Sequence, residues 1–147
     1  MVNTSNVTNM ASAFVNASKL EKLPLIDTNG VTNWYHAFKG CSSLKSVPAF
    51  DFSSATSLNE TFHSCSALVD FPLVSIPRVT AMNNIFSSCI NLSNDSLNNI
   101  MAMCINASAY NQAKTLKQLG LTSTQTTTCQ SLSNYQAFLA AGWTTGY

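Results

Sequence analysis

Four phenylalanines lie 24 residues apart along the chain without one insertion. Other columns keep the same register, because a leucine stands six residues after each phenylalanine and a cysteine stands three residues after the last three of them. These residues are Phe14, Phe38, Phe62 and Phe86, then Leu20, Leu44, Leu68 and Leu92, and Cys41, Cys65 and Cys89. A unit this small cannot bury its own apolar side. We therefore expect the units to stack, with equivalent side chains superposed in a shared core.

Within each unit the spacing of the apolar residues changes. In the second unit the first apolar residues follow intervals of three and four, which is typical of one face of a short helix. They are Val31, Trp34, Phe38 and Cys41. Residues 44–48 then have the shorter spacing of an extended strand, and they end on a proline. Proline lacks the N–H that a regular ladder needs, so the predicted strand is short.

The run from Val31 to Pro48 resembles the pattern V-T-x-M-x-x-M-F-x-x-C-x-x-L-x-x-[IL]-P of BspA-type leucine-rich-repeat surface proteins. The resemblance covers about residues 6–97, although Trp34 and Leu58 replace the methionine and the fourth unit lacks the proline. It implies an α/β leucine-rich-repeat solenoid, with short helices on one side and a parallel sheet of short strands on the other. It also implies adhesion or recognition at a bacterial cell surface or in a gut phage, instead of catalysis.

Beyond Leu92 the register fails, and local signals predict a helical cap. The run Ser93-Asn94-Asp95-Ser96 supplies N-cap residues for a helix through about Asn106, and residues 116–121 have the spacing of a fifth strand. The inward face of that helix is expected to hold Leu97, Ile100, Met101 and Cys104. We therefore expect one domain over 1–147, with 24-residue repeats over about 6–97 and a C-terminal repeat and cap over about 98–147.

Two more helices are expected in this cap. Thr122 and Gln125 have the spacing of a capping box, and Ser133 can cap a last helix that ends at Gly142. The side chains of the last helix that should point inward are Tyr135, Phe138 and Leu139. The chain begins inside a repeat without an equivalent cap, so we expect it to be a fragment or the last part of a longer array.

Charge and hydropathy exclude several classes of partner. Only 9% of the residues are charged and the net charge is +1, which is too little to hold a nucleic acid by its phosphates. Polarity comes instead from Ser, Thr and Asn, which fill 51 positions. The longest apolar run, Ile100 to Ile105, is far shorter than a membrane span, and no export signal is visible at the start. A bacterial cell surface or a virion surface is the expected location.

The residues that could carry chemistry do not form a catalytic set. The cysteine column, with Cys104 and Cys129 in the cap, is read as buried free thiols, because stacked cysteines have poor disulfide geometry and converge on no metal. His36 and His63 occupy different positions of the repeat, so they are expected to be surface residues. Asp27 and Asp51 share a column and are read as caps of Asx turns. We expect no enzyme, no cofactor and no metal.

The leading hypothesis is a recognition module that binds a protein or a glycan through the face of the predicted sheet. Its candidate binding residues are Glu21, Lys22, Lys45, Ser46, Asp70, Lys117 and Gln118. Their mixed signs favour hydrogen bonding over electrostatic steering, although the same strip could simply be solvated. The alternative is a structural, decoration or receptor-binding domain of a phage virion, which contacts neighbouring subunits of the tail, fibre or capsid.

Overall fold

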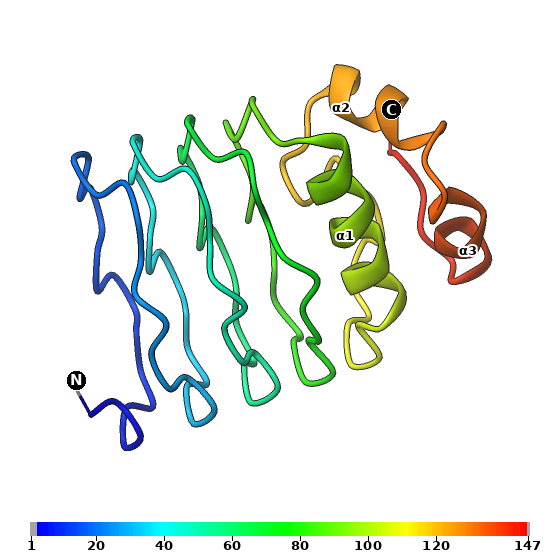
Figure 1. Cartoon of the computed structure of the whole chain (residues 1–147). Coiled ribbons are helices and arrows are strands. Elements are labelled where there is room, and N and C mark those ends of the chain that lie inside the picture. Colours follow the sequence, from blue (N-terminus) through cyan, green and yellow to red (C-terminus); the bar gives the residue numbers. More distant parts are fainter. Residues whose placement is uncertain (1–2, 147) are drawn as a thin grey trace.

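The computed structural model describes residues 3–146, and it shows successive 24-residue coils lying side by side in one elongated stack (Figure 1). We number the first three coils as residues 7–30, 31–54 and 55–78, and the fourth begins at residue 79. Three helices close the C-terminal end: α1 (Asn94–Ile105), α2 (Ser123–Cys129) and α3 (Tyr135–Ala140).

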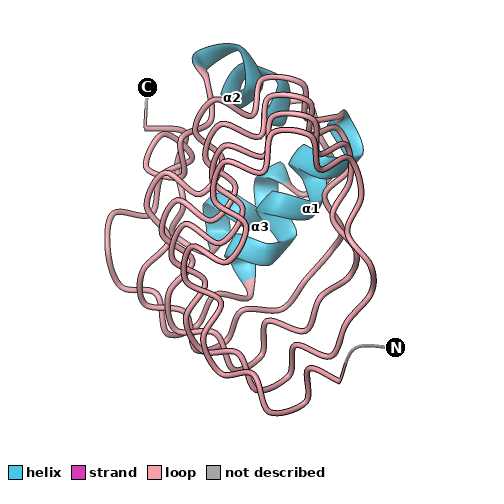
Figure 2. Ribbon diagram, turned by 90° about the vertical axis from the view of Figure 1, so that its left-hand side faces the viewer, coloured by secondary structure: helices cyan, strands magenta, loops and turns pink. Residues whose placement is uncertain are grey.

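The expected fold class is wrong, because residues 3–146 contain no β-strand, no sheet and no helix outside the C-terminal third. The coils are built of turns and irregular segments, as the ribbon in Figure 2 shows. The β-type pairing between neighbouring coils consists of isolated parallel bridges, which include Asn9 with Asn33, Asn33 with Ser57, and Ser57 with Ala81. The chain is therefore a stack of turn-rich coils and not an α/β leucine-rich-repeat solenoid.

The segment around each phenylalanine is a series of turns where a helix was predicted. Ala37 N donates to Trp34 O at 2.9 Å, a bond across three residues, whereas Phe38 N donates to Thr61 O of the next coil at 2.9 Å. Beyond its first turn, an α-helix would bond each N–H to a carbonyl four residues earlier in the same segment. Here every second N–H donates to a carbonyl of the neighbouring coil. The three-and-four spacing of apolar residues therefore reflects consecutive turns.

Two positions in every coil have the left-handed backbone conformation that these turns require. They lie two residues before and two residues after the phenylalanine, and their φ values range from 53° to 77°. They are Ser12, Asn16, His36, Gly40, Glu60, Ser64, Asn84 and Ser88. Only Gly40 adopts this region without steric cost, so the bonds between coils must hold the other seven in place.

The extended segment after each coil's leucine is shorter than the strand that was predicted. Ser46 and Asp70 form one parallel bridge, in which Val47 N donates to Asp70 O at 3.1 Å. Pro48 follows immediately and has no N–H to donate, so pairing stops there. The sequence correctly predicted that the proline limits this pairing, but the pairing that remains is only a bridge.

The phenylalanine column forms the centre of the stack. The rings of Phe14, Phe38, Phe62 and Phe86 follow one another at centroid distances of 5.4, 5.5 and 6.1 Å, with interplanar angles of 8–9°. The last three are fully buried, as are Leu44 and Leu68, and Leu92 is 8% exposed. The expected superposition of equivalent side chains is confirmed.

The first coil departs from the predicted core. Phe14 is 37% exposed and Leu20 is only partly buried, because within residues 3–146 each has a neighbouring coil on one side only. Burial in this stack depends on a coil above and a coil below.

The helical cap agrees with the local signals, apart from three details. Ser93 caps α1, and Thr122 and Gln125 form the capping box of α2. In α3 the N-cap is Asn134 without a side-chain bond, while Leu139 is 38% exposed and not inward. Residues 116–121 form no strand, because they fold into turns in which Leu119 N bonds Leu116 O at 3.1 Å and Gly120 N bonds Lys117 O at 2.9 Å. Among the described residues, no helix is long and apolar enough to cross a membrane.

Candidate functional site

Five of the predicted binding residues lie side by side on three successive coils. Lys45 N donates to Glu21 O at 3.2 Å, and Asp70 N donates to Lys45 O at 3.2 Å. Ser46 is bridged to Asp70, and Lys22 is exposed beside Glu21. We call the segments 21–25, 45–49 and 69–73 the proline face, because each of them carries a proline.

The other two predicted residues, Lys117 and Gln118, lie elsewhere. Gln118 O accepts a 2.8 Å hydrogen bond from Asn84 N, and Asn84 precedes the phenylalanine of the fourth coil by two residues. Residues 117–118 therefore continue the turn segments around the phenylalanines and not the segments of the proline face. The prediction placed them wrongly because it treated residues 116–121 as another strand of the same sheet.

The proline face also exposes apolar side chains that the prediction did not include. Leu25 is 72% exposed, Leu73 is 60% exposed and Val69 is 39% exposed. Leu25 and Leu73 occupy the same position of the repeat, directly after the proline. Since alternate residues of an extended segment face opposite ways, the register of the repeat could have revealed this outward column.

A pocket of about 240 Å³ opens at the C-terminal end of the proline face, where the third coil meets α1. Its lining residues are Val47, Asp70, Phe71, Pro72, Ser93, Asp95, Ser96 and Asn99. Only Asp70 belongs to the predicted binding residues. The remaining polar groups come from the start of α1, whose docking position no repeat register could indicate.

Ser96 holds the two sides of this pocket together. Its hydroxyl donates to Val69 O at 2.7 Å and accepts from Phe71 N at 2.7 Å. The Asn99 side chain adds a bond from Nδ2 to Phe71 O at 3.0 Å. The wall of the pocket is thus fixed by buried hydrogen bonds and not by loop contacts alone.

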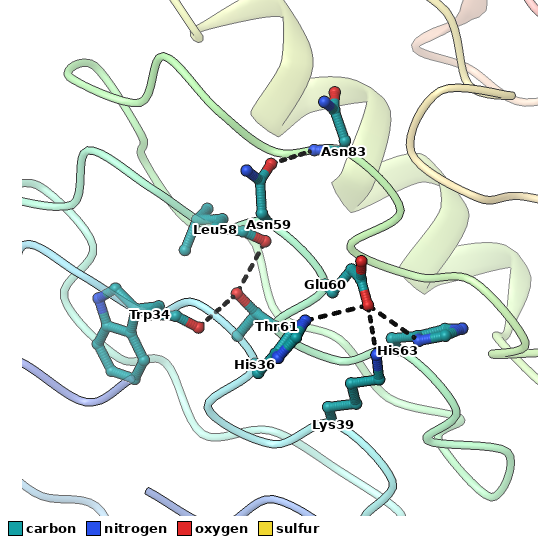
Figure 3. Close-up of polar contacts among 9 residues, drawn as sticks. All are labelled: Trp34, His36, Lys39, Leu58, Asn59, Glu60, Thr61, His63 and Asn83. Atoms are coloured by element: carbon teal, nitrogen blue, oxygen red, sulfur yellow. Dashed lines mark hydrogen bonds and ion pairs between the residues drawn. The ribbon is translucent and has the colours of Figure 1, made fainter. Parts of the chain in front are cut away.

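A second polar cluster lies in the turn segments around the phenylalanines, where both histidines surround one carboxylate (Figure 3). Glu60 Oε2 lies 2.6 Å from Lys39 Nζ, 3.1 Å from His36 Nε2 and 3.3 Å from His63 Nδ1. His36 and Glu60 share one column, and Lys39 and His63 share another three residues further on. Side chains of these two columns therefore meet on neighbouring coils. The sequence prediction missed this contact because it considered each histidine separately.

The cluster has the chemistry of a structural ion-pair network. The hydrogen bond from Lys39 is the main reason that the pKa of Glu60 lies below its ordinary value, with the charge of Lys39 and the two histidines adding to it. Neither facing histidine nitrogen has the geometry of a hydrogen bond to Glu60. Within residues 3–146 no group of three or more histidine, cysteine, aspartate or glutamate side chains could hold a metal ion.

The cysteines are free and buried, as expected. The thiol sulfurs of Cys41, Cys65 and Cys89 each lie 3.0–3.2 Å from a phenylalanine carbonyl of the preceding coil. Burial raises the pKa of Cys89 to about 12 and raises that of Cys65 as well. These thiols are protonated at neutral pH and serve as small core donors.

Asp27 and Asp51 cap turns, as the sequence indicated. Asp51 Oδ1 accepts from Ser53 N at 2.8 Å, and Asp27 Oδ1 accepts from Asn29 N at 3.1 Å. The hydrogen bonds from Ser53 lower the pKa of Asp51.

Comparison with known proteins gives one match. A family described as "Mycoplasma protein of unknown function, DUF285" matches residues 1–100, which include all four phenylalanines of the repeat. No curated protein and no solved structure matches the chain.

Proposed function

The chain belongs to the DUF285 family of Mycoplasma proteins, and we propose that it is a non-enzymatic recognition module of a surface protein that binds a protein partner through the proline face. The observation that carries this proposal is the combination on one face of exposed apolar side chains with charged ones of both signs.

The composition of the proline face suits a protein partner better than a glycan. Leu25, Val69 and Leu73 expose apolar surface beside Glu21, Lys45 and Asp70. Protein interfaces combine apolar contact with a polar rim, whereas singly scattered surface leucines need no explanation. Here the leucines recur at one repeat position on coils held in register by hydrogen bonds, so their exposure follows the repeat and is not scattered.

Rigidity of the face supports the same function. Backbone hydrogen bonds join Glu21 to Lys45 and Lys45 to Asp70, and the core beneath them includes the fully buried Leu44 and Leu68. A face that is already ordered loses little conformational entropy on binding. Stacked repeats commonly offer such extended surfaces to their partners.

The reactive groups of the chain support recognition over catalysis. The thiols of Cys65 and Cys89 are buried and have raised pKa values, so they are poor nucleophiles. Glu60 is held by three basic side chains, which makes it a weak base. We assign no catalytic step to any of these residues.

The proposed location at a cell surface draws on the resemblance of the repeats to BspA-type surface proteins. The low content of charged residues, together with 51 Ser, Thr and Asn residues, gives an uncharged hydrogen-bonding exterior. A surface with few charges attracts few proteins by nonspecific electrostatics, so the selectivity of binding depends on local contacts.

The test is binding of the purified chain to a panel of purified extracellular-matrix and cell-surface proteins and to a glycan array. The double variant Leu25→Ser/Leu73→Ser should weaken binding of a protein at least about tenfold, because it removes the exposed apolar anchors. Ile90→Ser is the matched control, since Ile90 is 62% exposed but lies outside the proline face. Equal loss in both variants, or binding only to glycans, would contradict the proposal.

A further inference from the structure

The pocket at the end of the proline face has an uneven supply of hydrogen-bonding groups. The Ser93 hydroxyl donates to Ser96 Oγ at 3.0 Å, and the Ser96 hydroxyl donates to Val69 O. The Asn99 amide donates to Phe71 O. Both hydroxyl donors of the lining and one of the two amide N–H donors of Asn99 are therefore already used within the protein.

The carboxylates of Asp70 and Asp95 are left for an incoming group. Both residues are exposed, and within residues 3–146 neither side chain accepts a hydrogen bond or forms an ion pair. The neighbouring cation, Lys45, instead pairs with Glu21 on the preceding coil at 3.1 Å. Asp70 and Asp95 thus bring two negative charges to the lining of one pocket, and no basic side chain of residues 3–146 pairs with them.

The other walls are apolar, because Val47, Phe71 and Pro72 contribute to the lining. About 240 Å³ is less than the volume of a typical drug-sized ligand site and suits one side chain. Lysine and arginine combine an aliphatic stem with a cationic end, and they bury the stem along apolar surface while the charge meets its partner. No other common side chain matches both an apolar wall and a pair of carboxylates.

We propose that this pocket binds a lysine or arginine side chain of a protein partner, between the carboxylates of Asp70 and Asp95 and against Val47, Phe71 and Pro72. The inference rests on the proposed function, since it assigns the chemistry of the partner that the proline face recognises. A saccharide is a poorer occupant, because hydroxyl recognition needs donors as well as acceptors and all but one of the side-chain donors here are engaged.

The rigidity of the pocket favours specific recognition. Asp70 is held by backbone bonds to the second coil, and Asp95 lies in the first turn of α1, whose cap Ser93 accepts from Ser96 N at 3.1 Å. The carboxylates therefore project from two elements that the Ser96 bonds lock together. A preorganised pair of charges gives more selectivity than two mobile surface acids.

The experiment is an NMR titration of the isotope-labelled chain with three probes of similar size. They are the N-acetyl N-methylamides of lysine, arginine and norleucine, of which norleucine carries the stem without the charge. We expect the two cationic probes to shift the amide signals of Phe71, Ser96 and Asn99, with weaker binding at higher salt. The norleucine probe should bind at least about tenfold more weakly, because it lacks the charge.

Isosteric variants then assign the contact. Asp70→Asn/Asp95→Asn should weaken the binding of the lysine and arginine probes at least about tenfold, because both charges are lost. Asp27→Asn is the matched control, because it removes one carboxylate far along the chain while asparagine can still accept the turn bond from Asn29 N. Preserved amide dispersion in each variant shows that the fold persists.

Three outcomes would overturn the inference: equal shifts with norleucine, no shift with either cationic probe, or unchanged affinity in the double variant. Its failure is distinguishable from failure of the proposed function. A protein partner whose binding depends on Leu25 and Leu73 but not on Asp70 and Asp95 would keep the recognition module and remove the basic-side-chain pocket.

Discussion

The coils and the C-terminal cap obtain their order from different hydrogen bonds. In the coils, Phe38 N bonds Thr61 O, 23 residues away, and the first three coils have the same arrangement. In the cap, α1 and α2 begin at side-chain caps only three residues from the N–H groups they bind. The comparison shows that short-range sequence signals are reliable where the bonds are short-range, and misleading where a neighbouring coil supplies the partner.

The largest expected effect tests stacking within the coils. Phe62 is fully buried between Phe38 and Phe86, so Phe62→Ala should lower the free energy of unfolding by about 3–5 kcal/mol. Phe14 is 37% exposed and has one ring neighbour, so Phe14→Ala should cost about half as much or less. Chemical denaturation of both variants measures the difference. Equal losses would show that stacking on both sides does not stabilise the column.

The next effect concerns the junction of the two regions. Ser96→Ala should cost about 1–3 kcal/mol, because it leaves the buried Phe71 N without its partner and leaves Val69 O with only the bond from Ser93 N. Asn94→Ala, an exposed change two residues earlier in α1, is the control and should have little effect. Thermal unfolding followed by circular dichroism compares them. A Ser96→Ala variant as stable as the control would mean that α1 docks by apolar contact alone.

A smaller effect concerns the left-handed turn positions of the coils. Gly40→Ala should cost about 1–2 kcal/mol, because φ is +77° and the new Cβ would lie against the Asn16 side chain of the preceding coil. Ser64 occupies the same repeat position with φ of 61°, so Ser64→Gly should stabilise the chain by a few tenths of a kcal/mol. Denaturation midpoints of the pair check the prediction, which fails if both changes move stability in the same direction.

The smallest effect concerns the cluster around Glu60. Its pKa is lower in the folded chain than in the unfolded chain, so its stabilisation is present above the unfolded pKa and is lost as the pH falls through the folded pKa. Glu60→Gln should therefore lower stability near neutral pH by about 1 kcal/mol or less, and the difference from the natural chain should vanish in acid.

Glu21→Gln is the matched control for this cluster, because Glu21 and Lys45 pair with side chains that are 59% and 63% exposed. Solvent screens such a pair, so the change should be nearly silent at every pH. Urea denaturation across the acid range measures both variants. A pH-independent loss in Glu60→Gln would show that its role is packing and not charge.

The accuracy of the sequence predictions depended on how far apart in the sequence the hydrogen-bonded groups lie. The capped helices, the buried cysteines and the stacking of Phe38 on Phe62 were predicted correctly, since each follows from residue type or from the 24-residue register. The helix predicted around each phenylalanine was wrong, because its apolar spacing also fits consecutive turns whose N–H groups bond the next coil. The candidate binding residues Glu21, Lys22, Lys45, Ser46 and Asp70 lie together on the proline face, whereas Lys117 and Gln118 lie apart from it.

By itself the sequence determined the period of the repeat, the identity of its core columns and the caps of α1 and α2, because these depend on residues close in sequence or on an unbroken register. Only the tertiary structure decided that turns replace helices and bridges replace strands. It also decided that His36 and His63 meet at Glu60 and that α1 places Asp95 beside Asp70. The physical reason is that each of these features is made by groups on different coils, whose partners are chosen by how the coils and the cap pack.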